Sequence, residues 1–146
     1  MTSIERSKPA DRAAIEALLV ASDLPLDGLE LALATAVVAR DGDTVVGVAA
    51  VEPYGTVGLL RSVAVTETLR GTGLGRGLVT AAEDVAAESG IETLFLLTET
   101  AAEWFPRLGY EASDRAGVPA ALASSPEFTD ACPDSAAVFR KMIDAG

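Results

Sequence analysis

Residues 56–77 read TVGLLRSVAVTETLRGTGLGRG, in which an apolar stretch runs into a segment rich in glycine. The branched apolar residues of 56–65 predict a strand, and the periodic residues after the glycines predict a helix to about Ser89. Glycines between a strand and a helix let several backbone N–H groups turn toward one point, and the helix start adds unpaired donors. With Arg70 and Arg76 nearby, this arrangement predicts an anion site suited to a pyrophosphate. The alternative is a glycine-rich turn that binds nothing.

Two common phosphate-binding motifs do not fit this run. The P-loop ends in Gly-Lys-Ser/Thr, whereas Gly77 is followed by Leu78. The dinucleotide fingerprint is Gly-x-Gly-x-x-Gly in a strand–helix–strand unit. Here Gly71, Gly73 and Gly75 have a different third spacing, and three predicted antiparallel strands precede them. A pyrophosphate site in this segment therefore belongs to neither class.

The composition indicates a single acidic globular domain that spans residues 1–146. Hydrophobic residues make up 49% and the formal net charge is -11, which disfavours nucleic acid and anionic membranes as partners. No apolar run is long enough for a membrane span, so we expect a cytoplasmic protein. The acidic, lysine-poor composition is also typical of proteins made for high salt. The chain has no histidine and a single cysteine, Cys132, which excludes a Ser-His-Asp triad and a cysteine zinc site, and we expect no metal.

The rest of the chain predicts an α+β fold with a mixed, mostly antiparallel sheet flanked by helices. The predicted strands are 3–9, 34–41, 44–52, 56–65, 93–99, 110–114 and 137–142. The predicted helices are 11–22, 28–33, the one that ends near Ser89, and 100–109. The helix between 56–65 and the apolar run TLFLLTE (93–99) predicts that these two strands run parallel. Residues 115–135 are a predicted insertion between the last two strands, either a cap over a site or a structural addition.

Two motifs together resemble the signatures of the GNAT N-acetyltransferases. LLRSVAV-TETL-RGTGLG resembles the family pattern of a strand followed by Arg/Gln-x-x-Gly-x-Gly/Ala. LFLLTETAAEWFPRLGY resembles a second signature, an apolar strand followed by a short helix. The order of elements matches the family along the whole chain. The resemblance implies the GNAT fold, in which two parallel central strands splay apart, and an acetyl-CoA-dependent N-acetyltransferase.

The resemblance also implies which residues bind acetyl-CoA. Backbone amides of residues 71–76 would hold the pyrophosphate, and the backbone of Val63 and Val65 would pair with the pantetheine arm. The Val63 N–H would donate to the thioester oxygen, which is a catalytic role. The predicted cofactor-binding residues are Val63, Val65, Arg70, Gly71, Thr72, Gly73, Leu74, Gly75, Arg76, Thr98 and Phe105.

The residues that handle protons in many members of the family are replaced here. Phe105 stands where the family often has a tyrosine acid, Thr98 stands where it often has an asparagine, and the strand before the glycines carries no glutamate. Glu99 is a candidate catalytic base, or else a carboxylate that opens the next helix. Tyr110 is a candidate catalytic acid, or else a core aromatic. We therefore expect direct attack by a bound amine, promoted by proximity and by the oxyanion contact.

Arg61 is unusual because it interrupts an apolar strand. Strict alternation along that strand places Arg61, Val63 and Val65 on one face of the sheet. A buried arginine needs a partner, which is either a protein carboxylate such as Glu52 or Glu99 or an anionic group of the substrate. The predicted substrate-binding residues are Arg61, Ser62 and Arg115.

Within the family, three motifs and the tail point to a smaller group. Four segments resemble the small acetyltransferases encoded with arsenic-resistance genes, namely LLRSVAV, LFLLTETAAEWF, RLGY and the tail VPAAL-SSPEF-CPDSAAVFRK. The tail also resembles glutamate-type amino-acid N-acetyltransferases. Both resemblances imply a small amine or an amino-acid-like acceptor, and the first implies a link to arsenic resistance. Homodimers are common in the family. Two alternatives stay open, namely a different acyl donor or acceptor, and a non-catalytic acyl-CoA-binding module.

Overall fold

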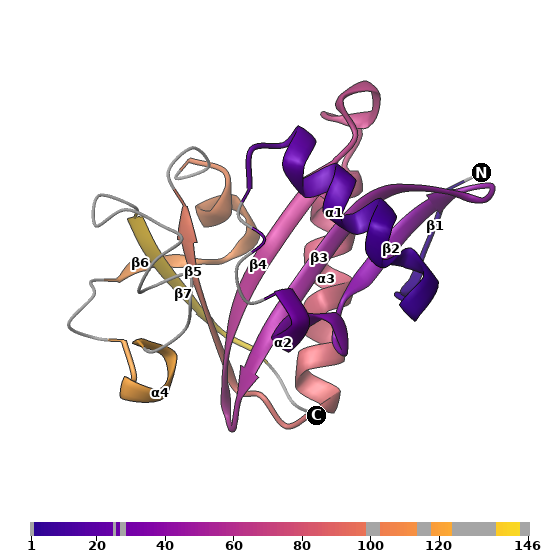
Figure 1. Ribbon diagram of the computed structural model, residues 1–146. Helices are drawn as coiled ribbons and strands as arrows, with labels where there is room; N and C mark the ends of the chain where they lie inside the picture. Colours follow the sequence, from indigo (N-terminus) through magenta and orange to yellow (C-terminus); the bar gives the residue numbers. More distant parts are fainter. Residues whose placement is uncertain are drawn as a thin grey trace.

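The computed structural model describes residues 2–24, 26, 29–98, 103–113, 118–123 and 137–143 of the chain (Figure 1). In this part of the chain, one seven-stranded sheet has the order β1-β2-β3-β4-β5-β7-β6. The strands are β1 (Thr2–Arg6), β2 (Val37–Asp41), β3 (Thr44–Tyr54), β4 (Val57–Val65), β5 (Thr93–Thr98), β6 (Glu111–Ser113) and β7 (Ala137–Met142). The α-helices are α1 (Arg12–Ala21), α2 (Leu29–Leu33), α3 (Leu74–Glu88) and α4 (Ala120–Ala123). Short 3₁₀ turns are η1 (Pro9–Asp11), η2 (Glu67–Leu69) and η3 (Phe105–Leu108).

The sheet is mixed, as the sequence predicts. Strands β4 and β5 run parallel, and every other neighbouring pair is antiparallel. The two strands run parallel because α3 connects the end of β4 to the start of β5, so that both strands begin at the same end of the sheet. The predicted α+β class is therefore confirmed.

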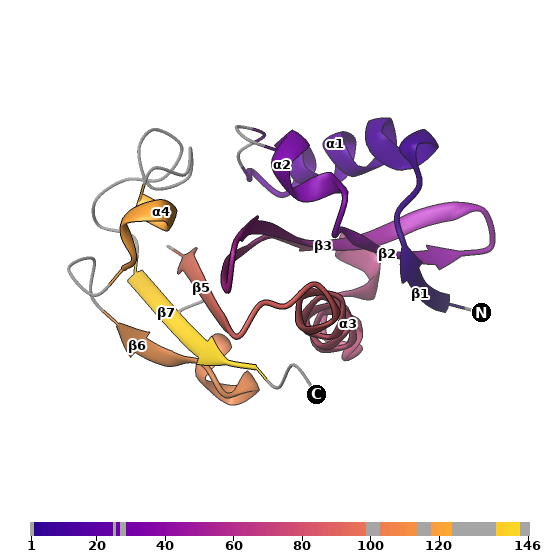
Figure 2. The same ribbon diagram turned by 90° about the horizontal axis from the view of Figure 1, so that it is seen from below.

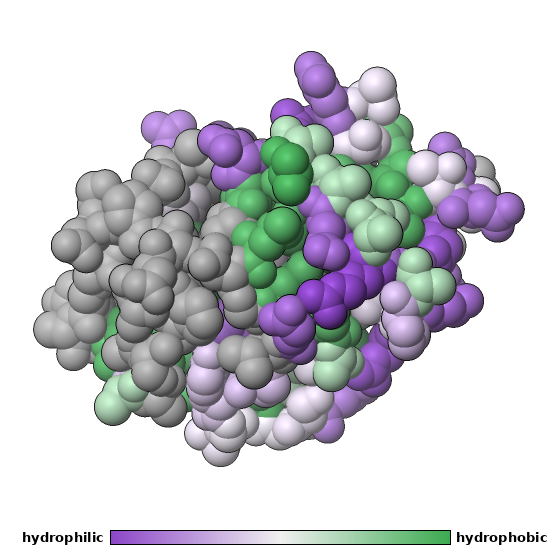
Figure 3. Space-filling view, in the orientation of Figure 1, coloured by the Kyte–Doolittle hydropathy of each residue, from purple (hydrophilic) through white to green (hydrophobic). Residues whose placement is uncertain are grey.

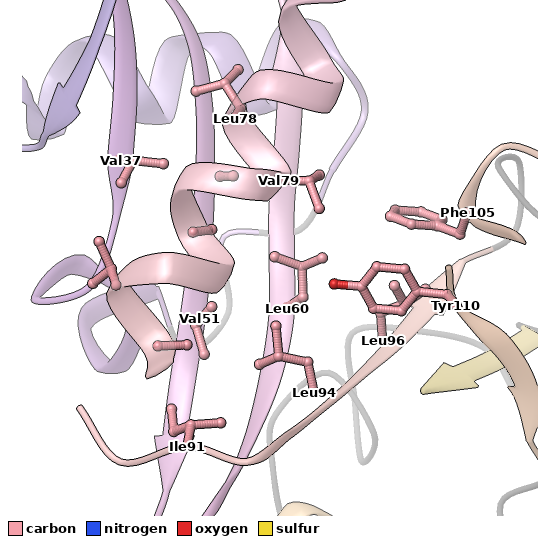
Figure 4. Close-up of a cluster of buried hydrophobic side chains, with 14 of the residues drawn as sticks. Val37, Val51, Leu60, Leu78, Val79, Ile91, Leu94, Leu96, Phe105 and Tyr110 are labelled. Atoms are coloured by element: carbon pink, nitrogen blue, oxygen red, sulfur yellow. The ribbon is translucent and has the colours of Figure 1, made fainter. Parts of the chain in front are cut away.

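Helices cover both faces of the sheet, with α3 on one face and α1 and α2 on the other (Figure 2). Leu78 of α3 belongs to a buried cluster that contains Val51 of β3 (Figure 4). Ile15 of α1 belongs to a separate cluster with Val48 of the same strand. Residues 48 and 51 thus point to opposite faces, as alternation requires. Each such fully buried side chain stabilises the fold by about 1.5–3 kcal/mol relative to an exposed one.

Strands β4 and β5 pair over a short distance and then diverge. Their parallel register covers Val57–Leu59 on β4 and Thr93–Phe95 on β5. Beyond that point β5 keeps its full antiparallel pairing with β7, while β4 continues along β3 (Figure 1). The residues after Leu59 therefore form one wall of an opening between two halves of the sheet.

A β-bulge interrupts β4 at the point where the strands diverge. In the β3–β4 register, Ala50 is opposite Arg61 and Val48 is opposite Ala64, so Ser62 and Val63 share one position across from the partner strand. Ser62 has φ +59°, a left-handed conformation that a side chain with a Cβ disfavours. Such a bulge bends the strand and re-aims the residues that follow it.

The bulge changes the face on which Arg61 lies, which corrects the prediction from strict alternation. Val63 and Val65 pack against the cluster under α3. Arg61 instead forms an ion pair with Glu52. Glu52 lies two residues after Ala50, which packs against residues 32 and 36 on the α2 face. The extra residue at the bulge shifts the alternation by one, so Arg61 and Val63 face opposite sides of the sheet.

The predicted helix at 100–109 is only partly described, and it is shorter than expected. Residues 103 and 104 form a turn, and η3 follows as a single 3₁₀ turn. Pro106 removes one backbone donor, and Gly109, at φ +93°, ends the turn in a left-handed conformation. In the predicted insertion, residues 118–123 are described and include α4.

Candidate functional site

A cavity of about 680 Å³ lies where β4 and β5 diverge. Its lining comes from the second half of β4, the glycine-rich loop and first turn of α3, the end of β5, and the segment around η3. Leu24, from the segment after α1, also lines it. The cavity therefore joins the opening in the sheet to the start of α3, and it brings the end of β5 and the segment around η3 next to the glycine-rich loop.

Most of the predicted cofactor-binding residues line this one cavity. They are Val63, Val65, Arg70, Gly71, Gly73, Gly75, Arg76, Thr98 and Phe105. Thr72 and Leu74 are not among the lining residues. The Thr72 hydroxyl instead donates a 2.6 Å hydrogen bond to the carbonyl of Leu69, at the end of η2.

Gly71 and Gly73, just before α3, are required by their backbone conformation and not by close packing. Gly71 has φ +82° and Gly73 has φ +87°, and a Cβ added at either would meet no atom within 4 Å. Gly73 is the N-cap of the 15-residue α3 and has no side chain to bond the first-turn N–H groups. These donors and the helix dipole make the helix start suitable for an anion.

Three arginines gather at this end of the cavity. Arg70 Nε donates to the Val65 carbonyl at 3.1 Å, and Arg76 Nη2 donates to the Arg107 carbonyl at 3.1 Å. Arg107 also lines the cavity. These contacts hold positive charge beside the helix start, although the chain carries a net charge of -11. The local potential therefore favours an anionic ligand where the global charge would repel it.

Trp104 and Phe105 close the cavity on the side of η3. Trp104 stands against Gly75, where an added Cβ would lie 3.3 Å from Cζ2 of the indole ring. The Trp104 and Phe105 rings meet edge to face, with centroids 4.9 Å apart. Phe105 is 6% exposed and belongs to the main core cluster. Gly75 is thus small for a packing reason, and Phe105 offers the cavity an apolar surface without a proton to donate.

Tyr110 does not line the cavity. Its hydroxyl donates a 2.8 Å hydrogen bond to Glu83 Oε2 and points toward α3 (Figure 4). Lys141 Nζ contacts both Glu83 oxygens, at 3.1 and 3.0 Å, and the Leu108 carbonyl. Burial raises the pKa of the Tyr110 hydroxyl well above its ordinary value, and the Glu83 charge and hydrogen bond add to this effect. These contacts are those of a core aromatic, which was the alternative interpretation of this residue.

We therefore expect Tyr110→Phe to lower stability without slowing turnover. The change deletes a hydrogen bond to a charged group, which is worth about 1.5–3 kcal/mol, and it keeps the ring. The free energy of unfolding, measured by urea titration, should fall by that amount while kcat stays within about twofold. A large loss of kcat at unchanged stability would restore Tyr110 as a catalytic acid.

Arg61 lines the cavity wall, but its side chain is fully buried. Its Nη1 donates to Glu52 Oε2 at 2.6 Å, and both side chains are 0% exposed. Its Nε donates to Ser62 Oγ at 3.0 Å. Glu52 Oε1 accepts a further hydrogen bond, 2.5 Å long, from the Tyr54 hydroxyl. Of the alternatives that the sequence left open, a protein carboxylate, Glu52, is the observed partner, which disfavours Arg61 as a grip for the substrate.

Two predicted site residues, Glu99 and Arg115, fall outside the described part of the chain. Within the described residues, no group of three or more Asp, Glu, Cys or His side chains could hold a metal ion, and no helix has the length and hydropathy to cross a membrane.

The sequence did not point to Leu24, Trp104 or Arg107 as cavity residues. On the face that carries α1 and α2, hydrophobic residues gather beside strongly hydrophilic ones (Figure 3). Near the end of α1, the apolar side chains of Val20 and Leu26 are 65% and 37% exposed. Leu24 lies between them in the chain and reaches the cavity. The exposed apolar residues that follow an amphipathic helix are the sequence feature that could have predicted this part of the cavity wall.

Comparison with known proteins gives one family and several similar structures. A model of the acetyltransferase (GNAT) domain matches residues 32–112. N-acetylglutamate synthase from Neisseria gonorrhoeae, complexed with coenzyme A and N-acetyl-glutamate, is 20% identical over 98% of this chain, with a TM-score of 0.83. Rv2747 from Mycobacterium tuberculosis, in complex with CoA and NLQ, is 24% identical over 97% of this chain and 99% of that chain, with a TM-score of 0.80.

The similarity also extends to a ribosomal-protein-S18-alanine N-acetyltransferase from Escherichia coli. That protein is 19% identical over 99% of this chain and 95% of that chain, with a TM-score of 0.67. By contrast, this chain matches only 35% of the gonococcal synthase. The structural matches show a shared fold, and the family model covers more than half of the chain. The chain therefore belongs to the GNAT acetyltransferase family.

Proposed function

We propose that the protein is an acetyl-CoA-dependent N-acetyltransferase whose acceptor is a small amine or an amino-acid-like molecule. The observation that carries this proposal is the cavity between β4 and β5, which ends at the N-terminus of α3. One end offers backbone donors and arginines to a diphosphate, and the other is an apolar passage between two strands. This combination suits a ligand with an anionic head and a long, narrow arm, which is the chemical shape of coenzyme A.

Different residues around the cavity would bind different parts of acetyl-CoA. Backbone N–H groups of residues 71–76 would bind the diphosphate, and Arg70 and Arg76 would add charge. The backbone of Val63 and Val65 would pair with the pantetheine arm. The Val63 N–H would donate to the thioester oxygen, where negative charge develops when an amine attacks. When bound, acetyl-CoA supplies the activated acetyl group, and the protein supplies position and charge stabilisation.

Proton transfer in this proposal does not depend on a histidine, because the chain has none. Once it is held near the thioester, the neutral amine would attack the carbonyl carbon and the C–S bond would break. The proton lost by the amine would end on the departing thiolate, so that coenzyme A leaves as the free thiol. Glu99, which lies outside the described residues, stays a candidate base. Phe105 and Leu96 would contribute by keeping water away from the reacting groups.

The structural similarity to an N-acetylglutamate synthase supports the acceptor class. The gonococcal synthase is complexed with N-acetyl-glutamate. The exposed apolar segment around Leu24 suits a small molecule with a short aliphatic portion. The resemblance to arsenic-resistance acetyltransferases stays a prediction, and growth on arsenate with and without the gene would test it.

Two measurements test the proposal. Calorimetry with coenzyme A and acetyl-CoA should show binding with a Kd of about 1 μM to 1 mM, the range usual for enzymes and their substrates. Release of free thiol from acetyl-CoA should accelerate when a suitable amine is added from a panel of amino acids, polyamines and short peptides. Tight binding without thiol release for any amine would favour the non-catalytic acyl-CoA-binding module. Absence of coenzyme A binding would reject both functions.

A further inference from the structure

The bulge in β4 holds a residue in a conformation that its side chain disfavours. Ser62 has φ +59°, and among the described residues only Asp23, at φ +57°, is another non-glycine with positive φ. Asp23 lies in the turn after α1, where such a conformation is common. Ser62 lies instead within a strand that is buried and lines the cavity. Strained backbone of this kind persists only when its surroundings hold it in place.

A buried hydrogen-bond network contacts Ser62 and can keep it in this conformation. Arg61 Nε donates to Ser62 Oγ, and Arg61 Nη1 donates to Glu52 Oε2. The Tyr54 hydroxyl donates to the other Glu52 oxygen. Since Glu52 is on β3 and Arg61 is on β4, the network ties the bulge to the neighbouring strand. It lies on the α2 face, opposite the face on which Val63 packs.

We propose that Arg61 is a positioning residue, which together with Glu52 holds Ser62 in its left-handed conformation and thereby fixes the backbone of Val63 at the cavity wall. This inference rests on the proposed function, because Val63 is the residue whose N–H would meet the thioester oxygen. Without the network, the strand can relax toward regular pairing. A change of one residue in register reverses the direction of every following residue, so Val63 would no longer meet the cavity in the same way.

A purely structural role of the ion pair makes a different prediction. Buried ion pairs are weak evidence for stability, because well-packed apolar residues often replace both partners at no cost. The double variant Glu52→Leu/Arg61→Met removes both charges and leaves neither partner behind. The double variant therefore tests the loss of the contacts to Ser62 in a core that contains no unpaired charge.

The first test is a comparison of kcat in two backgrounds. In the natural background, the double variant should lower kcat by about 100-fold, the loss that a ~1 Å displacement of a catalytic contact can cause, with little change in Tm or in the KM for acetyl-CoA. In a Ser62→Gly background, the same double replacement should cost much less, because glycine adopts positive φ without support. Equal losses in both backgrounds, or no loss in either, would overturn the proposal.

A second test does not need turnover. The Cα and Cβ chemical shifts of Ser62, measured by NMR on the protein without substrate, report its backbone conformation. In the double variant they should move away from left-handed values, while those of Asp23 should stay unchanged as an internal control. Unchanged Ser62 shifts would contradict the positioning role even in an active enzyme. If the natural protein shows no acetyl transfer to any amine, the proposed function fails, and these shifts still decide whether Arg61 holds the bulge.

Discussion

Gly73→Ala should weaken coenzyme A binding by about 100-fold while the protein stays folded. Gly73 is the N-cap of α3 at φ +87°, and a Cβ there would enter the open space beside the first-turn N–H groups. An alanine would push the backbone from its left-handed conformation and turn those donors away from the diphosphate. The loss of two charge-assisted hydrogen bonds, each worth about 1.5 kcal/mol or more, corresponds to roughly 100-fold in Kd.

Gly90→Ala is a matched control for this change. Gly90 follows the other end of α3 and has φ +89°, and a Cβ added there would also meet no atom within 4 Å. Both variants should therefore lose a similar amount of stability, about 1–2 kcal/mol, in urea titrations. Only Gly73→Ala should change the Kd for coenzyme A measured by calorimetry. Equal affinities in the two variants would contradict a diphosphate site at the start of α3.

The order of elements and the glycine-rich loop could be predicted because they depend on local patterns. Apolar runs of strand length, the periodic helix before Gly90 and the glycines of the loop each carry their signal within a few residues. The nearness of the loop to Thr98 and Phe105 required the family resemblance, since no local pattern relates these segments. The described structure places all three at one cavity.

The bulge at Ser62 could not be predicted from the sequence. Strict alternation assumes that each residue of β4 has one partner on β3, and a bulge appears only when the two strands are paired. A left-handed serine is also invisible in a pattern, because that conformation is usually taken by glycine or asparagine. The prediction for the face of Arg61 was wrong for this reason, although Glu52, one of the partners that the sequence left open, is the one observed.

Trp104 and Arg107 were missed as cavity residues for a different reason. They belong to the segment around η3, whose geometry depends on Pro106, on the left-handed Gly109 and on packing against α3. A regular helix over 100–109 would point these side chains in other directions. The local helix propensity of these residues favours a regular helix, but tertiary packing stabilises the shorter turn instead.

Arg61→Ala should lower the free energy of unfolding by about 3–5 kcal/mol, a large fraction of the stability of an ordinary domain. The Glu52 side chain is 0% exposed and would lose the guanidinium that now lies 2.6 Å away, which leaves a buried polar group without its ionic partner. A buried charge that loses its partner is far more costly than a pair that is removed together. Urea titrations of the single variant and of Glu52→Leu/Arg61→Met should therefore show a severe loss in the first and near-natural stability in the second.

Arg70→Ala is the control for the loss of an arginine from the same cavity. Arg70 is exposed and donates one hydrogen bond to a backbone carbonyl, so its removal should change stability by no more than about 0.5 kcal/mol. It should weaken coenzyme A binding instead, because a charge near the diphosphate is lost. If Arg61→Ala left stability unchanged and raised only the KM of the amine, the guanidinium would be contacting the substrate. The burial of Arg61 and its bonds to Glu52 and Ser62 predict the opposite result, because a group held this closely by protein atoms is not free to bind the acceptor.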